Sequence, residues 1–156
     1  MTASTTTQTK RSSKAQAGTA LVELAIMLPL LIVLILGAVD FGRVFYAAIE
    51  LGNAVTAGAE YGSRLTTKVT DVTGIKSVVT SDAADLSGVS FPSDPTSYCT
   101  CPGSSTHVTC TSTCTGYGKP KEYVSVTANY TWTTLVPWPG ITNSVALSRT
   151  VVMRAQ

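Results

Sequence analysis

The sequence predicts an α+β protein in which a long N-terminal transmembrane helix is followed by a second short helix and a small antiparallel β-sheet with a disulfide-bonded loop. Three observations predict this fold class. An apolar run occupies residues 19–39, apolar and polar residues alternate near the C-terminal end, and four cysteines fall within one short segment. Once the apolar run is reserved for lipid, about 100 residues remain, which suffice for one small domain.

The apolar run has the length of a single membrane span. It reads TALVELAIMLPLLIVLILGAV. As a helix, about 21 residues extend ~31 Å, close to the ~30 Å hydrocarbon core of a bilayer. Lys10, Arg11 and Lys14 precede the run, whereas charges of both signs follow it. Because positive charge favours the cytoplasmic side, the sequence predicts a cytoplasmic N-terminus and an exported remainder.

A secretory signal peptide is the alternative interpretation of this run. Its apolar core would be about 7 to 15 residues long and would end in a small-residue A-x-A cleavage site. The run is longer, and Leu36-Gly37-Ala38 places a bulky residue where the first small one belongs. These features favour a helix that stays in the mature protein.

The helix is predicted to continue beyond the membrane over residues 40–66, because apolar residues recur there every three or four positions. Ala54, Gly58 and Gly62 are spaced by four residues and therefore share one face, on which another backbone can approach closely. The favoured interpretation is that this face packs against the protein's own sheet. The alternative is that it contacts another subunit.

Residues 67–156 are predicted to form an extracytoplasmic α+β domain. Asp71 is a suitable N-cap for a second helix that runs to about Ala84. The residues of this helix predicted to face inward are Val72, Ile75, Val78 and Val79. Glycine, serine, aspartate and two prolines predict a loop over residues 86–95, with at most a short strand around residues 89–91.

Two strands are predicted near the C-terminal end. Residues 123–132 alternate in polarity, which is typical of a half-buried strand. Its apolar face is predicted to carry Val124, Val126, Ala128 and Tyr130. A turn over residues 137–140 separates this strand from a second one over residues 144–153. Together they predict an antiparallel hairpin packed on the helix.

The four cysteines, Cys99, Cys101, Cys110 and Cys114, define a loop over residues 99–114. An even number in a small exported domain favours two disulfides. A bond between the first two would close a strained ring, which leaves a crossed or a nested pairing. Tetrahedral zinc is the alternative, although cysteine pairs in zinc sites are usually separated by roughly two to four residues and the first pair here is closer. The sequence favours disulfides and no metal.

Nucleic-acid binding and catalysis have little support in the composition. The formal net charge is only +2, and no cluster of Lys and Arg is interleaved with aromatic residues. The single histidine, His107, lies in the predicted cysteine loop without an obvious catalytic partner. We therefore predict a protein that is not an enzyme, needs no cofactor and does not bind nucleic acid.

Glu23 is the unusual residue of the apolar run. A carboxylate near mid-membrane costs roughly 2.5 to 3.5 kcal/mol, so such a residue normally has a role. It lies five positions after Gly18, which directly follows a hydrophilic leader with positive charge. The segment GTALVELAIMLPLLIVLILGAVDFGR resembles type IV prepilins and, more closely, the TadE-like pseudopilins of the tight-adherence (Flp) pilus system. The resemblance continues in AAIELGNAVTAGAEYGSRLTT, in YVSVTANYTWTTLVPWPG and in VALSRTVVMR.

The resemblance implies a type IV pilin-like anchor that is processed before use. In that family a prepilin peptidase cuts after the glycine, which here would remove the leader, residues 1–18, and leave Thr19 as the N-terminus with Glu23 at the fifth position. The new α-ammonium could pair with the carboxylate of a neighbouring subunit in a low-dielectric environment. The alternative is a carboxylate that reaches the lipid headgroups without such a partner.

The implied function is structural. The resemblance implies a minor pilin or pseudopilin in a tight-adherence pilus that supports surface adhesion and biofilm formation. Its partners would be the prepilin peptidase, other pilins or pseudopilins, the assembly platform and membrane lipid, with a single-pass location in a bacterial inner membrane and at the cell surface after assembly. Major Flp pilins are shorter and usually carry an aromatic residue where this chain has Leu24, which favours a minor role. The alternative from another class is a membrane-tethered extracytoplasmic binding or redox domain that does not polymerise.

Overall fold

A computed structural model describes residues 12–137 and 140–156, with side chains described from residue 18 onward. It contains two helices and one four-stranded antiparallel sheet, which confirms the predicted α+β fold class. The elements in chain order are α1 (Ser12–Ser63), α2 (Val72–Asp82), β1 (Thr96–Thr100), β2 (His107–Val108), β3 (Lys121–Thr133) and β4 (Ser144–Arg154). The chain divides into two compact units, Met1–Phe41 and Gly42–Gln156, and α1 contributes to both. Each unit is described by itself below.

Helix α1 begins earlier and ends slightly earlier than the sequence predicted. It starts at Ser12, within the predicted leader, where Ala15 and Ala17 have high helix propensity. It ends at Ser63, whose hydroxyl donates a hydrogen bond to the carbonyl of Glu60 at 3.0 Å. The predicted extension to residue 66 is therefore three residues too long. Residues 1–11, which carry most of the predicted leader, lie outside the described residues.

In the second unit, one face of α1 forms the centre of a small hydrophobic core. The other helix, α2, has the predicted N-cap: a carboxylate oxygen of Asp71 accepts a hydrogen bond from the backbone N–H of Gly74 at 3.0 Å. Two of its four predicted inward residues, Ile75 and Val79, are fully buried. The buried residues that α1 supplies to this core are Ala47, Leu51, Ala54, Val55 and Ala59.

The sheet has the strand order β2-β1-β3-β4, and every neighbouring pair is antiparallel. Strands β3 and β4 form the predicted hairpin, paired from Tyr123 with Arg154 to Thr133 with Ser144. In the predicted turn, Trp138 and Pro139 lie outside the described residues.

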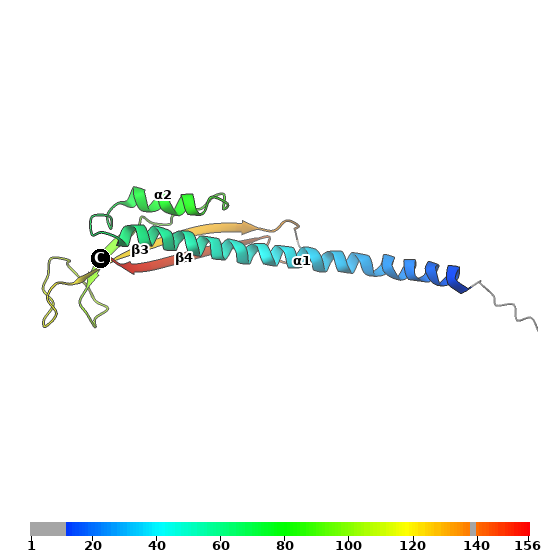
Figure 1. Ribbon diagram of the computed structural model, residues 1–156, viewed down its shortest axis with the longest axis horizontal. Coiled ribbons are helices and arrows are strands. Elements are labelled where there is room, and N and C mark those ends of the chain that lie inside the picture. Colours follow the sequence, from blue (N-terminus) through cyan, green and yellow to red (C-terminus); the bar gives the residue numbers. More distant parts are fainter. Residues whose placement is uncertain (1–11, 138–139) are drawn as a thin grey trace, which may run out of the picture. The chain divides into compact units, whose positions relative to one another are not determined.

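The two faces of the sheet differ in polarity. Val124, Val126 and Ala128 of β3 are buried in the same core as the residues of α1 and α2, so both helices cover one face of the sheet, as the side-by-side ribbons show (Figure 1). The alternate residues of β3 and β4 point to the other face, where Thr127 and Thr150 share a hydrogen bond at 2.9 Å between their hydroxyl oxygens. Strand β4 is mostly exposed, and Val145 keeps 39% of its surface accessible.

The sequence analysis missed two strands, β1 and β2: β1 ends inside the predicted cysteine loop and β2 lies within it. His107 therefore lies in a short strand, not in a loop, and its ring stacks on that of Tyr98 at a centroid distance of 4.2 Å. Neither strand shows a clear alternation of apolar and polar residues, and both are defined by tertiary pairing, of β1 with β3 and of β2 with β1. Of the predicted strand at residues 89–91, the structure has one bridge, in which Ser90 and Asn129 exchange backbone hydrogen bonds at 2.8 and 2.9 Å.

Candidate functional site

The residues predicted to take part in processing and subunit pairing lie together on α1, at the start of its apolar segment. Thr19 and Glu23 are four residues apart and therefore lie on one face of the helix, one turn from each other. Gly18, Val22 and Ile26 border the same surface. The side chain of Glu23 is exposed on it. This arrangement places a carboxylate one turn beyond the Gly18-Thr19 bond, on an otherwise apolar surface.

Gly18 has no packing role in the described structure. A Cβ atom added there would meet no heavy atom within 4 Å, and the residue lies in ordinary right-handed helix. A helix interior disfavours glycine by about 1 kcal/mol relative to alanine. The local fold therefore gives no reason for glycine at this position.

The apolar surface around Glu23 is not covered by protein. Among the described residues, one helix is long and apolar enough to cross a membrane, with a mean hydropathy of 2.7 over its most apolar 18-residue window. None of that window is buried. Exposed apolar surface of this extent in water would cause association, so the segment requires lipid or the apolar surfaces of other chains.

The second predicted site, the stripe of small residues, is already occupied inside the domain. A Cβ atom on Gly58 would overlap a methyl group of Val79 and lie 3.3 Å from the carbonyl oxygen of Ile75. On Gly62 it would lie 3.0 Å from Ile75 and 3.2 Å from Val124. The stripe thus packs against α2 and β3 of the same chain. The sequence analysis named the sheet as its partner and missed α2.

Ala54 completes the stripe and is fully buried in the same core. The face that it shares with the two glycines is therefore filled by the protein's own side chains.

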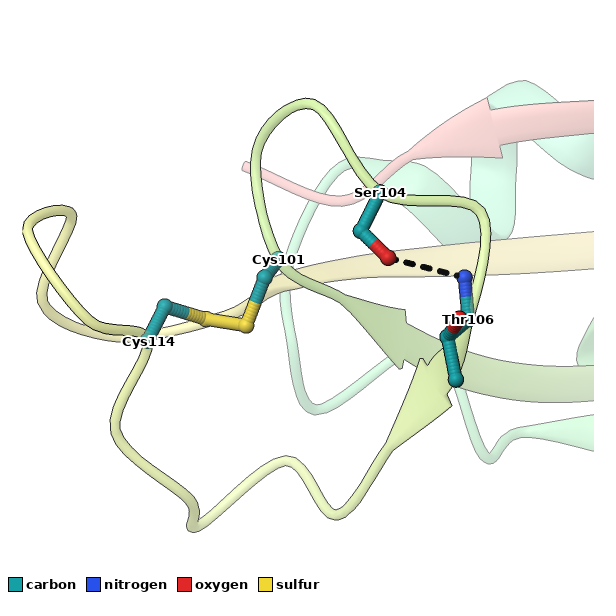
Figure 2. The surroundings of a disulfide bond; sticks show 4 residues. All are labelled: Cys101, Ser104, Thr106 and Cys114. Atoms are coloured by element: carbon teal, nitrogen blue, oxygen red, sulfur yellow. Dashed lines mark hydrogen bonds between the residues drawn. A yellow bond between two sulfur atoms is a disulfide. The ribbon is translucent and has the colours of Figure 1, made fainter.

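The four cysteines form two disulfides, Cys99 with Cys110 and Cys101 with Cys114. This is the crossed pairing, one of the two that the sequence left open. Figure 2 shows the second bridge tying the segment after β1 to the segment that leads to β3.

A hydrogen bond closes the turn inside the crossed bridges. The backbone N–H of Thr106 donates to the hydroxyl oxygen of Ser104 at 3.1 Å (Figure 2). Two disulfides and a local turn thus hold the cysteine segment in place. The hydrophobic core is formed mainly by residues of α1, α2 and β3.

One group of side chains has the composition of a metal site. Ligand atoms of Cys99, Cys110 and Glu122 lie within 4.8 Å of one another. The two sulfur atoms are bonded to each other, however, and a metal binds cysteine as the free thiolate. The oxidised loop therefore offers only the carboxylate of Glu122 at this place.

A polar cluster joins the end of α1 to the start of α2. The hydroxyl of Tyr61 donates to a carboxylate oxygen of Asp71 at 2.7 Å, and the ammonium of Lys68 lies 3.1 Å from the same oxygen. The Tyr61 hydrogen bond, with the Gly74 N–H and Lys68, lowers the pKa of Asp71 from 3.8 to about 2. The sequence predicted the cap but not this cluster, because Tyr61 and Lys68 carry no local signal for it.

Comparison with protein families identifies one segment of the chain. Residues 18–60 match the model of a family described as TadE-like protein. No curated protein and no solved structure matches the chain significantly. The matched segment begins at Gly18, contains Glu23 and ends inside α1. The resemblance noted in the sequence begins at the same glycine. The predicted resemblance of β3 and β4 lies outside the match and stays a prediction.

Proposed function

We propose, from the match of residues 18–60 to TadE-like proteins, that the chain is a structural minor pilin or pseudopilin of a tight-adherence pilus. One observation supports this more than any other: the match starts at a glycine that has no packing role and continues through a carboxylate on an uncovered apolar helix. A soluble protein would have no use for that combination. A subunit that is processed and then packed among other helices needs each part of it.

Processing is the first step of the proposal. A prepilin peptidase cuts the bond between Gly18 and Thr19 and removes the leader, residues 1–18. The remaining part of α1 keeps the apolar segment, so the processed chain stays in the membrane. The domains then comprise a membrane helix over residues 19–39, its extension to the end of α1, and the α+β domain.

Pairing of Glu23 is the second step. After cleavage, Thr19 carries an α-ammonium group one helical turn from Glu23. In a low-dielectric environment the carboxylate is stabilised by an opposite charge, and the ammonium group of a neighbouring subunit supplies it. Such a pair fixes the axial position of one subunit against the next, because a shift leaves both charges unpaired.

The helix and the disulfides support the proposed location. The apolar helix found among the described residues, with positive charge before it, favours a cytoplasmic N-terminus in a bacterial inner membrane. The two disulfides suit the oxidising compartment on the other side. The partners of the subunit are other pilins or pseudopilins and the assembly platform, and its role in adhesion and biofilm formation is structural, not catalytic.

The experiment that tests this proposal compares two neutral replacements on the same helix. Glu23→Gln removes the carboxylate from the apolar segment, whereas Glu60→Gln removes an exposed one from the end of the matched segment. Pili are sheared from cells and the subunit is quantified in the pilus and membrane fractions. Breaking a buried ion pair costs about 3–5 kcal/mol, so we expect Glu23→Gln to reduce incorporation at least tenfold, roughly.

The control variant is expected to be incorporated normally. Equal incorporation of Glu23→Gln, Glu60→Gln and the natural chain contradicts the proposed pairing. Equal membrane levels of all three chains show that any difference arises in assembly.

A further inference from the structure

Strand β4 is a long edge strand. It contains 11 residues and lies at the end of the strand order β2-β1-β3-β4, paired on one side with β3 along its whole length. The opposite edge of the sheet is different, because β2 has only two residues and belongs to the disulfide-bonded segment. Only β4 therefore presents an extended edge in the described part of the sheet.

Two hydrogen bonds establish which backbone groups of β4 point away from β3. The N–H of Ala155 donates to the carbonyl of Glu122 at 2.9 Å, and the N–H of Thr134 donates to the carbonyl of Asn143 at 3.0 Å. Bonded and non-bonded pairs alternate in an antiparallel ladder, so the odd-numbered residues of β4 bond to β3. The residues whose N–H and C=O groups point outward are Ser144, Ala146, Ser148, Thr150, Val152 and Arg154.

This edge lacks most of the features that usually prevent strand addition, and its two arginines are the exception. Proteins commonly protect edges with charged side chains, above all lysine, and with proline, bulges or a covering element. Strand β4 has no proline or lysine, and its register with β3 runs without interruption. Its side chains are exposed or half-buried throughout, and Val152 keeps 46% of its surface accessible. Among the described residues, the outward groups have no backbone partner outside the ladder.

The charges on β4 favour one class of partner. Arg149 and Arg154 are its two charged residues, and the strand contains no acid. If β4 paired in antiparallel fashion with β4 of a second copy over its whole length, the two Arg149 side chains at the strand centres would lie opposite each other, and like charges at such positions are destabilising. A strand that carries glutamate or aspartate would instead pair each arginine with an opposite charge.

We propose that β4 is a docking edge for an extended acidic segment of another polypeptide, which adds to the four-stranded sheet as a further antiparallel strand. Backbone hydrogen bonds to the outward groups of β4 provide the affinity, and Arg149 and Arg154 provide the charge selection. This inference concerns only the second unit and does not depend on processing or on the pilus.

Hydrogen exchange of the full chain in detergent micelles tests the inference. The probe is a synthetic peptide of about 11 residues in which Thr and Val alternate except for two Glu placed to face the two arginines. A matched peptide has Lys at both Glu positions. We expect the acidic peptide to slow exchange of the outward amides of β4 by about tenfold or more at saturation, and the Lys peptide to have no effect.

Variants at one outward position separate backbone docking from surface attraction. Ser148→Pro removes an outward N–H, which an edge strand tolerates because that group does not bond to β3. Ser148→Thr keeps the N–H and is the matched control. We expect the proline variant to lose peptide-induced protection and the threonine variant to keep it.

A second variant reverses both charges of β4. Arg149→Glu combined with Arg154→Glu is expected to exchange the preference, so that the Lys peptide protects β4 and the acidic peptide does not. This variant decides the question if Ser148→Pro fails to form its two disulfides, because it leaves the backbone unchanged.

Three results would overturn the inference. The acidic peptide gives no protection, or both peptides protect equally, or β4 becomes protected without peptide as the protein concentration rises. The last result would assign the edge to a second copy of the chain.

Discussion

The two parts of α1 that belong to different units differ in what covers their apolar side chains. In the first unit Leu30 keeps 57% of its surface accessible, and its apolar neighbours are similarly exposed. In the second unit Leu51 is 0% exposed, because α2 and the sheet cover its face of the helix. One helix therefore contains a segment that needs a partner from outside the chain and a segment that is the core of a domain.

The difference follows from the distribution of apolar residues. Around residues 19–39 they occupy every side of the helix, and a helix that is apolar all round is stable only in lipid or among other apolar helices. Phe45, Tyr46 and Ile49 still expose apolar surface. From Leu51 onward the apolar residues occupy one face, interrupted by small residues that allow α2 to approach closely. Periodicity, not apolar content, separates the membrane segment from the domain core.

The largest expected effect comes from shortening one leucine in each part. Leu51→Ala leaves a cavity in the core and is expected to lower the free energy of unfolding of the domain by about 2–5 kcal/mol. Leu30→Ala is the matched control and should leave that free energy unchanged, because the side chain has no partner within the domain. Denaturant unfolding followed by tryptophan fluorescence measures both. Equal losses for the two variants would contradict the division between the segments.

Removing one disulfide has the next largest effect. The bridges close loops with separations of 11 and 13 residues, and each should contribute about 2–4 kcal/mol through restriction of the unfolded chain. We expect the double variants Cys99→Ser/Cys110→Ser and Cys101→Ser/Cys114→Ser to lose stability by similar amounts in the same denaturant assay.

Thiol titration of the purified natural chain checks the premise of that prediction. No free thiol should react before reduction, since all four cysteines are paired. Four reactive thiols together with bound zinc would instead favour the alternative of a metal-binding domain.

Alanine substitutions at two glycines of α1 are expected to have smaller effects on the stability of the domain. Gly58→Ala places a methyl group against Val79 and the backbone of Ile75, so it should destabilise the domain by about 1–3 kcal/mol. Gly52→Ala adds a methyl group where no heavy atom lies within 4 Å, so it should stabilise the helix by up to ~1 kcal/mol. Thermal unfolding of the two variants should therefore change in opposite directions. A gain in stability from Gly58→Ala would contradict close packing of α2 on this face.

The smallest expected effect is a pH dependence that arises from Asp71. Its carboxylate has a pKa near 2 in the folded chain, and about 3.9 is usual for an unfolded one. The contribution to stability is therefore fully present above the unfolded value and is lost as the pH falls from about 5 to 2. Asp71→Asn should flatten the fall in unfolding midpoint over that range, whereas Asp82→Asn, outside the cluster, should not. An unchanged slope in Asp71→Asn would contradict the role of the cluster.

Local patterns in the sequence were sufficient to predict most of the fold. The N-cap at Asp71, the alternation in β3 and the apolar run before residue 40 each depend on neighbouring residues only, and the structure has the elements that they predict. The disulfide pairing and strands β1 and β2 depend on which segments meet in space. The residues of β1 and β2 carry no local signal for these contacts, so the sequence does not predict the two strands.

The candidate site was predictable to a different degree. The spacing of Gly18 and Glu23 is visible in the sequence because it is local, and the family match covers it. The partner of the small-residue stripe was incompletely predicted, because any apolar surface satisfies the pattern and only the structure shows Val79 and Ile75 against it. The sequence alone could not predict that β4 is an edge strand, because this depends on the strand order.

The mass of the intact mature protein tests the central claim most directly. The chain is produced in cells with and without the prepilin peptidase, together with Gly18→Leu, a variant whose added side chain meets no nearby atom at its Cβ position. We predict a chain that begins at Thr19 only when the peptidase and Gly18 are both present. A natural chain that still carries its leader in the presence of the peptidase would contradict the account.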